Sequence, residues 1–280
     1  MITEAEIFIV ATPIGNLEDI TLRGLRILKE SDFIAAEDTR NTGKLLSKLE
    51  IKNKMISMHE HNEKEKADYI IDLALKGKKI AVVSDAGTPL ISDPGFRLIE
   101  KGLEKGIKFV PVPGVSALTA LVSVSGMPSD RFAFFGFLPS KKSSRDKILN
   151  DLIKADYPVL FYESPKRIIK TLNEMIEKTG NRQCVLGREL TKMHEEVIRG
   201  SLLEIVSVLE QKVSVKGEIS FMVQGGELKE ENDLSTEEII SSYPGLYDEK
   251  PKKTAEKIAH EFNLRKKDVY EAILKFKGKK

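Results

Sequence analysis

The 280-residue sequence contains one cysteine, Cys184, and no apolar run that approaches the ~20 residues of a membrane-spanning helix. A single cysteine excludes a disulfide framework and a zinc scaffold of cysteine pairs. Because Cys184 lies in an apolar stretch, we expect a buried, inert thiol. The first residues show no charged leader before an apolar segment. We therefore expect a soluble cytoplasmic protein that has no membrane partner.

An excess of charge of one sign is also absent. Lys and Arg number 45 against 43 Asp and Glu, so the net charge is +2 although 31% of the residues are charged. This balance gives no overall field that would hold nucleic acid, and such contacts would require local patches. Hydrophobic residues make up 41%, which is enough for a full core, and the length favours two domains.

Three common signatures of cofactor or metal binding are missing. There is no GxxxxGK[ST] loop for nucleoside triphosphates, no GxGxxG after a strand for dinucleotides, and no HExxH zinc motif. His59 and His61 would share one face of a strand, but a third ligand is not evident, and transition-metal sites want three or four. We expect no metal.

Strand-like and helix-like periods alternate along most of the chain. Five apolar runs indicate strands at 7–11, 32–36, 55–58, 80–83 and 108–111, and the helical stripes between them stop at Gly77 and Gly106. A second series indicates strands at 132–138, 159–162, 184–186, 197–200 and 219–223, with helices at 116–125, 146–153, 165–176 and 202–209. The pattern predicts an α/β fold with two sheets covered by helices.

Stiff and polar segments indicate the domain boundaries. Residues 111–114 (PVPG) form a plausible hinge, and the polar stretch from Glu227 to Asp233 suits a linker. Apolar stripes through Ala255 and Phe262 and through Val269 and Phe276 then predict a helical hairpin with a Lys-rich end. We expect an N-terminal α/β domain at 1–113, a C-terminal α/β domain at 114–226, and a linker with a helical tail at 227–280.

The loop from Ser84 to Gly95 (SDAGTPLISDPG) is the most informative segment. It follows a buried strand and contains two glycines, two prolines and two aspartates. Backbone groups can approach a flat ligand where side chains are small, and ligands of open α/β sheets lie outside the carboxyl ends of the strands. We expect this loop to bind a small molecule together with the loop after the first strand, where Pro13 and Gly15 narrow the turn.

Charged groups follow other strands of the first series. Glu37, Asp38 and Arg40 end the second strand and either face the same cleft, or Asp38 caps a helix while Arg40 points to solvent. Residues 59–62 (HEHN) follow the third strand and either bind substrate or phosphate, or form a polar loop.

The second series carries positive charge at its strand ends. Ser164 is expected to cap a helix with Pro165 at its first position, which places Lys166 and Arg167 near the cleft. Residues 141–147 (KKSSRDK) are expected to form a basic loop, which is either a solvated connection or a phosphate-contacting arm.

Seven ordered motifs resemble the ribosomal RNA small-subunit methyltransferase I family of the tetrapyrrole-methylase-like enzymes, which use S-adenosylmethionine (SAM). They are ATPIGNLEDITLR (11–23), AEDTR (36–40), HEHN (59–62), SDAGTPLISDPG (84–95), VPGVSA (112–117), FYESPKRI (161–168) and GRELTK (187–192). The resemblance spans Ile7 to about Gly225. Where the wider superfamily often has Gly-Asp-Pro, this chain has Ser84-Asp85-Ala86, as the RNA branch does.

The resemblance implies a class III SAM methyltransferase architecture of two α/β domains, a folded SAM in the cleft, and a homodimer. It implies 2′-O-methylation of a cytidine ribose in the decoding region of 16S ribosomal RNA, with the 30S subunit as partner. By position, the SAM contacts of the superfamily fall on residues of these motifs: Pro13, Asp85, Ala86, Gly87, Ser116, Ala117, Tyr162 and Leu190.

A ribose hydroxyl becomes a good nucleophile only when its proton is accepted, so a carboxylate or an imidazole is needed in the cleft. The candidates are Glu37, Asp38, His59 and His61. Substrate contacts are expected from Arg40, Asn62, Lys166 and Arg167, and further RNA contacts from residues 141–147 and 275–280.

Two other functions are compatible with the scaffold. One is methylation of a small tetrapyrrole-like macrocycle, against which the basic residues and the tail argue weakly. The other is a non-catalytic RNA- or ribosome-binding protein, which would not bind SAM.

Overall fold

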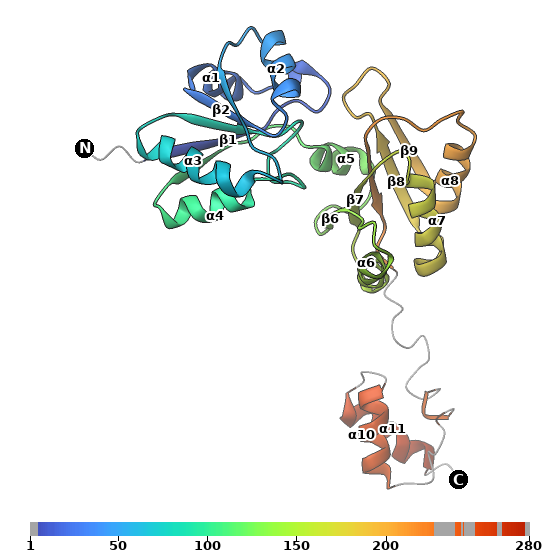
Figure 1. The fold of residues 1–280 in the computed structure, drawn as a ribbon. Coiled ribbons are helices and arrows are strands. Elements are labelled where there is room, and N and C mark those ends of the chain that lie inside the picture. Colours follow the sequence, from blue (N-terminus) through green and yellow to red (C-terminus); the bar gives the residue numbers. More distant parts are fainter. Residues whose placement is uncertain (1–4, 227–238, 242, 244–249, 262–264, 278–280) are drawn as a thin grey trace. The chain divides into compact units, whose positions relative to one another are not determined.

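The computed structural model describes residues 5–226, 239–241, 243, 250–261 and 265–277. The chain divides into two compact units, residues 1–225 and residues 226–280 (Figure 1). The expected linker at 227–233, Phe262 and residues 278–280 lie outside the described residues. Among the described helices, none combines the length and apolar character that crossing a membrane requires.

The first sheet is parallel throughout, in the order β3-β2-β4-β1-β5. Its strands are β1 (Glu6–Val10), β2 (Phe33–Ala36), β3 (Lys54–Ser57), β4 (Ile80–Val83) and β5 (Lys108–Val112). The five predicted strands are thereby confirmed within one or two residues. In a parallel sheet all carboxyl ends share one edge, so the loops after β1, β2, β4 and β5 converge there.

Helices cover both faces of this sheet, as alternation along buried strands requires. Phe8, Val10 and Ala81 pack against α1 (Leu22–Glu30) and α2 (Thr39–Lys48). Ile7 and Ile80, whose side chains point to the other face of the sheet, pack against α3 (Glu63–Leu75) and α4 (Phe96–Glu104) (Figure 1). A short 3-10 turn, η1 (Leu17–Asp19), precedes α1. The predicted α/β fold, with helices covering the sheet, is confirmed for this part of the chain.

The second sheet is mixed, in the order β6-β7-β10-β8-β9, and only β6 and β7 are parallel. Its strands are β6 (Ala133–Phe137), β7 (Val159–Glu163), β8 (Gln183–Arg188), β9 (Glu196–Ser201) and β10 (Ile219–Val223). Each contains or overlaps a strand that the sequence predicts. Strand β10 lies in the middle of this sheet, and all five of its residues are buried.

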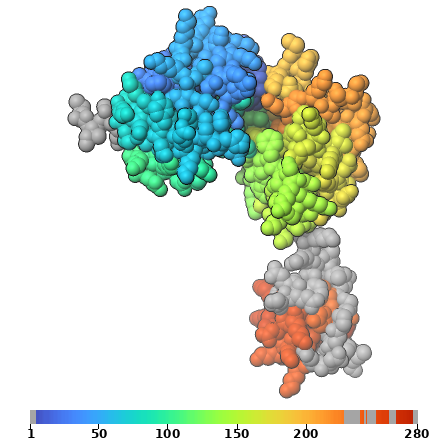
Figure 2. All heavy atoms as spheres, in the orientation of Figure 1, coloured from blue at the N-terminus to red at the C-terminus, as the bar shows by residue number. Residues whose placement is uncertain are grey.

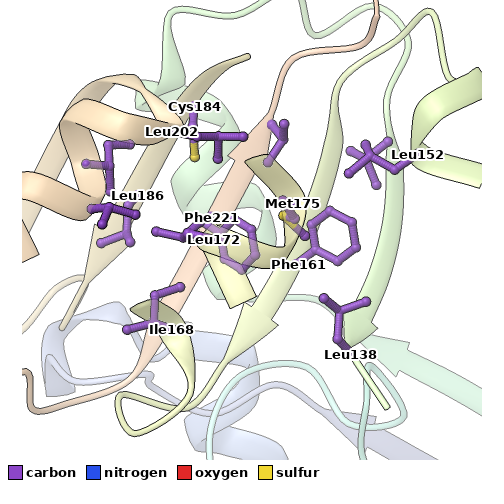
Figure 3. Close-up of a cluster of buried hydrophobic side chains, with 14 of the residues drawn as sticks. Leu138, Leu152, Phe161, Ile168, Leu172, Met175, Cys184, Leu186, Leu202 and Phe221 are labelled. Carbon is purple, nitrogen blue, oxygen red and sulfur yellow. The ribbon is translucent and has the colours of Figure 1, made fainter. Parts of the chain in front are cut away.

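One face of the second sheet packs against α6 (Lys142–Lys154), α7 (Ile168–Thr179) and α8 (Leu202–Glu210). Figure 3 shows Phe161 and Phe221 at the centre of this core, with ring centroids 5.3 Å apart in a stacked arrangement. Cys184 lies in the same core, 1% exposed, and burial raises the pKa of its thiol. The expected buried, inert cysteine is thus confirmed.

The other face of the second sheet packs against α5 (Ala117–Ser125) through Leu121, Leu160 and Met222. Ile14, from the loop after β1, belongs to the same cluster. A Cβ added at Gly15 would lie 2.3 Å from Cγ of Lys192, so only glycine permits this approach of the two loops. The loop after β1 therefore touches the loop after β8.

Two local predictions are wrong. Residues 142–147 belong to α6 and are not a loop, because Arg145 is buried and its guanidinium binds Glu174 and the carbonyls of Pro139 and Ser140. Helix α7 begins at Ile168, not at Pro165. Strand β5 ends at Val112, one residue beyond the predicted strand, and so overlaps the expected hinge at 111–114, whose role as a domain boundary stays a prediction.

The start of α7 has a physical reason. The N–H of Ser164 donates to its neighbour Glu163, while its carbonyl accepts from the N–H groups of Arg167 and Ile168. Ser164 thus closes a turn over 165–167 before the helix begins.

The second unit contains α10 (Pro251–Glu261) and α11 (Lys266–Lys277). Ala255 and Ile258 of α10 pack against Val269 and Ile273 of α11, with Ile239 and Ile240 completing the cluster. The predicted helical hairpin is confirmed for the described residues, and it has its own apolar core.

Candidate active site

The loops after β1 and β4 are joined by their backbones. Thr12 and Gly87 exchange two hydrogen bonds, with the Thr12 N–H donating to the Gly87 carbonyl at 2.8 Å and the reverse bond at 2.9 Å. Gly87 has φ +80°, a conformation that glycine adopts without strain. The main chain of the Ser84–Gly95 loop is therefore fixed against the first strand of the sheet.

The same loop has an unusual backbone further along. Leu90 and Ser92 have φ of 73° and 68°, although neither is glycine. Such residues are uncommon, and they concentrate where the surrounding structure holds a functional conformation. A Cβ added at Gly136 of β6 would lie 2.9 Å from the Ser92 hydroxyl oxygen, so the loop also contacts the second sheet.

A buried carboxylate holds the end of the loop. Glu63, which is 7% exposed, accepts hydrogen bonds from the N–H groups of Gly95 at 3.1 Å and Arg97 at 2.7 Å. These groups lie at the beginning of α4, where helical N–H groups have no partner within the helix. Glu63 of α3 therefore fixes the junction between the loop and α4.

A cavity of about 350 Å³ lies beside this loop. One side is lined by residues 86–88 and 91–93 with Ser116 and Ala117, and the other by residues 162–165, Leu190 and 217–220. Figure 2 shows a recess between the blue and cyan atoms of the first half of the chain and the yellow and orange atoms of the second. The volume suits a small molecule, since such sites span ~300–1,000 Å³.

Six of the residues predicted to bind the cofactor line this cavity: Ala86, Gly87, Ser116, Ala117, Tyr162 and Leu190. Pro13 and Asp85 do not line it, but each precedes a lining residue in the chain. Ser116 is the N-cap of α5, but its side chain makes no capping hydrogen bond.

Ser220, Glu163 and Asp93 are among the lining residues that were not candidates from the sequence. The Ser220 hydroxyl has no hydrogen-bond partner, and the residue is 3% exposed. Glu163 is 2% exposed and accepts from Ser164 and Thr171, with Arg167 at 3.3 Å. Asp93 and Glu163 stand inside quoted motifs, whereas Ser220 lies in an apolar strand that carries no local signal.

The proposed catalytic residues lie beside the cavity lining, not in it. Asp38 caps α2, and its carboxylate pairs with the Arg40 guanidinium at 2.7 Å. Hydrogen bonds from Arg40 lower the pKa of Asp38 to about 2. Burial, followed by the charge of Asp85, raises the pKa of Glu37. The two neighbouring carboxylates thus differ in basicity.

The two histidines of the 59–62 segment differ in exposure. Nδ1 of His59 is buried without a hydrogen-bond partner, whereas His61 is exposed. The Asn62 amide bridges the His59 N–H and the Ser57 carbonyl, and so it shapes the turn. Among the described residues no group of three or more His, Cys, Asp or Glu side chains is arranged to hold a metal ion.

Of the basic residues predicted to contact RNA, some are exposed and others already bind groups of the protein. Lys166 is exposed, as are Lys141 and Lys142 nearby in the sequence. The Arg167 guanidinium instead donates to the Leu138 carbonyl at 2.6 Å and contacts Glu163. Arg167 thus ties the ends of β6 and β7 together.

Comparison with known proteins identifies the scaffold. The family model of the tetrapyrrole (corrin/porphyrin) methylases matches residues 6–206. Cobalt precorrin-4 methyltransferase is similar with a TM-score of 0.60 at 17% identity, covering 79% of this chain and 95% of that one. Uroporphyrin-III C-methyltransferase from Thermus thermophilus, solved with S-adenosylhomocysteine, has a TM-score of 0.56 at 18% identity, covering 78% and 97%.

Two relatives in sequence are much nearer. The ribosomal RNA small subunit methyltransferase I of Halalkalibacterium halodurans is 41% identical over 270 residues, covering 94% of this chain and 93% of that protein. The protein of the same name from Thermotoga maritima is 47% identical over 222 residues, covering 79% and 99%. This chain belongs to the tetrapyrrole (corrin/porphyrin) methylases and, among them, to the ribosomal RNA small subunit methyltransferase I family.

Proposed function

We propose that this protein transfers a methyl group from SAM to the 2′-hydroxyl of a cytidine ribose in the decoding region of 16S ribosomal RNA. Family membership makes the chain a SAM-dependent methyltransferase. The relatives' names speak of the ribosomal RNA of the small subunit. The observation that carries the proposal is a cavity, lined by six positions of the SAM-binding motifs, on a chain that is 41–47% identical to these relatives.

The residues of the cavity fit SAM. A buried hydroxyl without a partner, such as that of Ser220, is costly unless a ligand completes its hydrogen bonding. Ala86 and Gly87 line the cavity and have little or no side chain, which leaves room for a ligand to approach the main chain. Ile14, Ala117 and Leu190 provide apolar surface for a purine ring. These residues would hold the cofactor between them.

SAM supplies a methyl group that is already activated by a positively charged sulfur, so the protein has to bind, orient and manage one proton. As the new carbon–oxygen bond forms, the hydroxyl proton passes to a base. Glu37 is better suited than Asp38, because its pKa is raised while the Asp38 carboxylate is engaged with Arg40. His59 remains a second candidate through its unpartnered Nδ1.

RNA is proposed to contact the exposed cations Lys141, Lys142 and Lys166, with Arg40 holding a neighbouring phosphate. The side chain of Arg40 is 85% exposed. Arg145 and Arg167 are less suited, since their guanidinium groups already bind protein carbonyls and carboxylates. Phosphate contacts of this kind weaken as salt concentration rises.

The 30S subunit as the partner, a homodimer and a cytoplasmic location belong to the same proposal. Light scattering of the purified protein, alone and with 30S subunits, measures the first two directly.

The decisive experiment uses purified 30S subunits that lack the modification. The protein and SAM labelled in the methyl group are added, and nucleosides of the 16S RNA are identified by mass spectrometry. The proposal predicts labelled 2′-O-methylcytidine from the decoding region. Label in a base, in another RNA or in a macrocycle would contradict it, and so would SAM binding without any transfer to 30S subunits.

A further inference from the structure

Three carboxylates lie together where the loops after β2 and β4 meet. Glu37 directly follows β2, and Asp85 and Asp93 belong to the Ser84–Gly95 loop. Asp93 lines the cavity, and Asp85 precedes the lining residue Ala86. Asp85 accepts hydrogen bonds from Asp38 and Asn41 of the segment after β2, and the charges of Glu37 and Asp85 both contribute to the raised pKa of Asp93. Glu37, Asp85 and Asp93 are called the acidic group below.

The acidic group has little positive charge to balance it. The hydrogen bonds to Asp85 come from two neutral donors, the Asp38 N–H at 3.2 Å and Nδ2 of Asn41 at 2.8 Å. Among the described residues, no salt bridge joins a Lys or Arg side chain to the acidic group. Arg40 acts on Asp85 from a distance, but its guanidinium is bound to Asp38.

The pKa of Asp93 is raised chiefly by burial, and the neighbouring carboxylates contribute to the same shift. Burial raises the pKa of Asp93 to about 6, and the charges of Glu37 and Asp85 act in the same direction, against a hydrogen bond from Ser84. Two further titratable groups face the cluster. The charge of Asp93 contributes to the raised pKa of Tyr162, whose main cause is burial, and His59 acts on Glu37.

A separate observation points to a ligand in the same cavity. Ser220, which lines it from the second sheet, is 3% exposed and its hydroxyl lacks a partner. Leu90 and Ser92, close to Asp93 in the chain, have positive φ, so this part of the loop adopts an uncommon backbone conformation. Asp93 is therefore part of the wall of a ligand site, and Glu37 and Asp85 lie beside that wall.

We propose that the acidic group selects the methyl donor, which has a positively charged sulfur, over the product, whose sulfur is neutral. This inference rests on the proposed function, in which SAM occupies the cavity. SAM and S-adenosylhomocysteine differ by one methyl group and by the sulfonium charge. A wall with uncompensated negative charge stabilises the cationic form and loses that attraction once the methyl group has left. The same wall therefore favours binding of the donor and release of the product.

The proposal has a pH signature. When Asp93 carries a proton the wall has one negative charge fewer, so selectivity for SAM is weaker below a pH of about 6 and grows as Asp93 ionises. By linkage, a bound cation lowers the proton affinity of Asp93, so SAM binding near this pH releases protons. Binding of S-adenosylhomocysteine releases fewer, because that molecule lacks the sulfonium charge.

The test is calorimetric titration of the full-length protein with SAM and with S-adenosylhomocysteine at pH values of about 5.5 and about 7. We expect the dissociation constant of S-adenosylhomocysteine, divided by that of SAM, to be about threefold or more larger at the higher pH than at the lower pH. An effect of this size is expected for one charge at short range. In Asp93→Asn the ratio should stay at the low-pH wild-type value at both pH values. Asp72→Asn, on the exposed side of α3, makes the same change in net charge and should behave as wild type.

A ratio that is the same at both pH values in the wild type, or unchanged in Asp93→Asn, overturns the inference. That result differs from failure of the proposed function, in which neither compound would bind at any pH. Because the wild-type pH dependence needs no variant, the test stands even if Asp93→Asn does not fold. Proton release, measured at a pH of about 6 in buffers of different ionisation enthalpy, must likewise be larger for SAM than for S-adenosylhomocysteine.

Discussion

At the scale of the residue, the Ser220 hydroxyl is expected to lower the stability of the free protein and to strengthen binding of the ligand. Its hydroxyl is buried in β10 without a hydrogen-bond partner and lines the cavity. An unsatisfied buried polar group costs roughly 1–3 kcal/mol, and a ligand that completes its hydrogen bonding recovers part of that. The free protein is therefore less stable at this position than the protein with a ligand bound to Ser220.

Ser220→Ala should therefore leave the free energy of unfolding of the ligand-free protein unchanged or raise it by up to about 1 kcal/mol. The same variant should bind SAM about fivefold more weakly, because a hydrogen bond to the ligand is lost. Urea unfolding and calorimetric titration measure the two effects.

Ser201 provides the matched control. Its hydroxyl caps α8 and takes part in a capping box with Glu204. Ser201→Ala should lower stability by about 1 kcal/mol and leave SAM affinity unchanged. If Ser220→Ala behaved like Ser201→Ala in both measurements, a role for Ser220 in binding would be excluded.

Glu37 is the residue that we expect to accept the proton of the ribose hydroxyl. Its pKa is raised, chiefly by burial, and a base must be ionised to accept a proton. The rate of methyl transfer should therefore fall as pH drops through a value above the ordinary 4.5 of a glutamate. Glu37→Gln should lower the rate by ~10²–10⁴-fold while SAM binding persists.

His61→Ala is the comparison for that experiment. His61 is exposed, and it should tolerate the change with little loss of rate. Wild-type rate in Glu37→Gln would transfer the role of base to another group, of which His59 is the next.

The sequence identifies site residues where backbone chemistry leaves a local signature. Ala86, Gly87 and Ser116 lie in small-residue loops at strand ends, and all three line the cavity. Ser220 could not be found in this way, because a serine within a buried strand looks like an ordinary core residue. The contribution of Asp93 depends on the proximity of Glu37, which lies far earlier in the chain, and only the fold reveals that proximity.

At the scale of the element, the Ser84–Gly95 loop depends on a neighbour that is distant in sequence. Glu63 of α3 accepts hydrogen bonds from the N–H groups of Gly95 and Arg97 and is 7% exposed. Without this carboxylate, two N–H groups at the start of α4 lose their partner. The loop that lines the cavity would then be less firmly held.

Glu63→Ala should lower the free energy of unfolding by about 2 kcal/mol, the cost of leaving buried donors unpaired. It should also weaken SAM binding and speed hydrogen exchange at Gly95 and Arg97. Glu65→Ala, an exposed change in the same helical turn, should do neither. Equal stability of the two variants would show that Glu63 does not hold the loop.

Elements were predictable where apolar periodicity decides them, and this covers every strand of the two described sheets. The errors lie where side-chain contacts decide. The polar run at 142–147 looks like a loop, but Arg145 folds back onto Glu174 and two carbonyls, which stabilises helix from Lys142 onward. Pro165 has the composition of a first helical residue, but the turn closed by Ser164 delays α7 to Ile168.

At the scale of the whole molecule, the chain divides into two units, and the helical unit has an apolar core of its own. Among the described residues, this core is formed by residues of that unit, including Ile240, Ile258 and Ile273. The Thermotoga maritima relative is matched over 99% of its length by 79% of this chain, so about a fifth of this chain has no counterpart there. Residues 226–280 make up a similar share.

A chain that ends at Gly226 should therefore keep the unfolding temperature of the methyltransferase part and bind SAM within about twofold of the full chain. If the helical unit supplies phosphate contacts, the shortened chain should bind 30S subunits more weakly and with a shallower dependence on salt. Unchanged 30S binding would assign the helical unit another role, and a large loss of stability would show that the units depend on each other.

The most direct measurement of the central claim is a crystal structure of the protein grown with SAM. The account predicts SAM in the cavity beside the Ser84–Gly95 loop, with main-chain groups of Ala86 and Gly87 and the Ser220 hydroxyl in contact with it. SAM bound elsewhere on the protein, with this cavity empty or closed by side chains, would contradict the account.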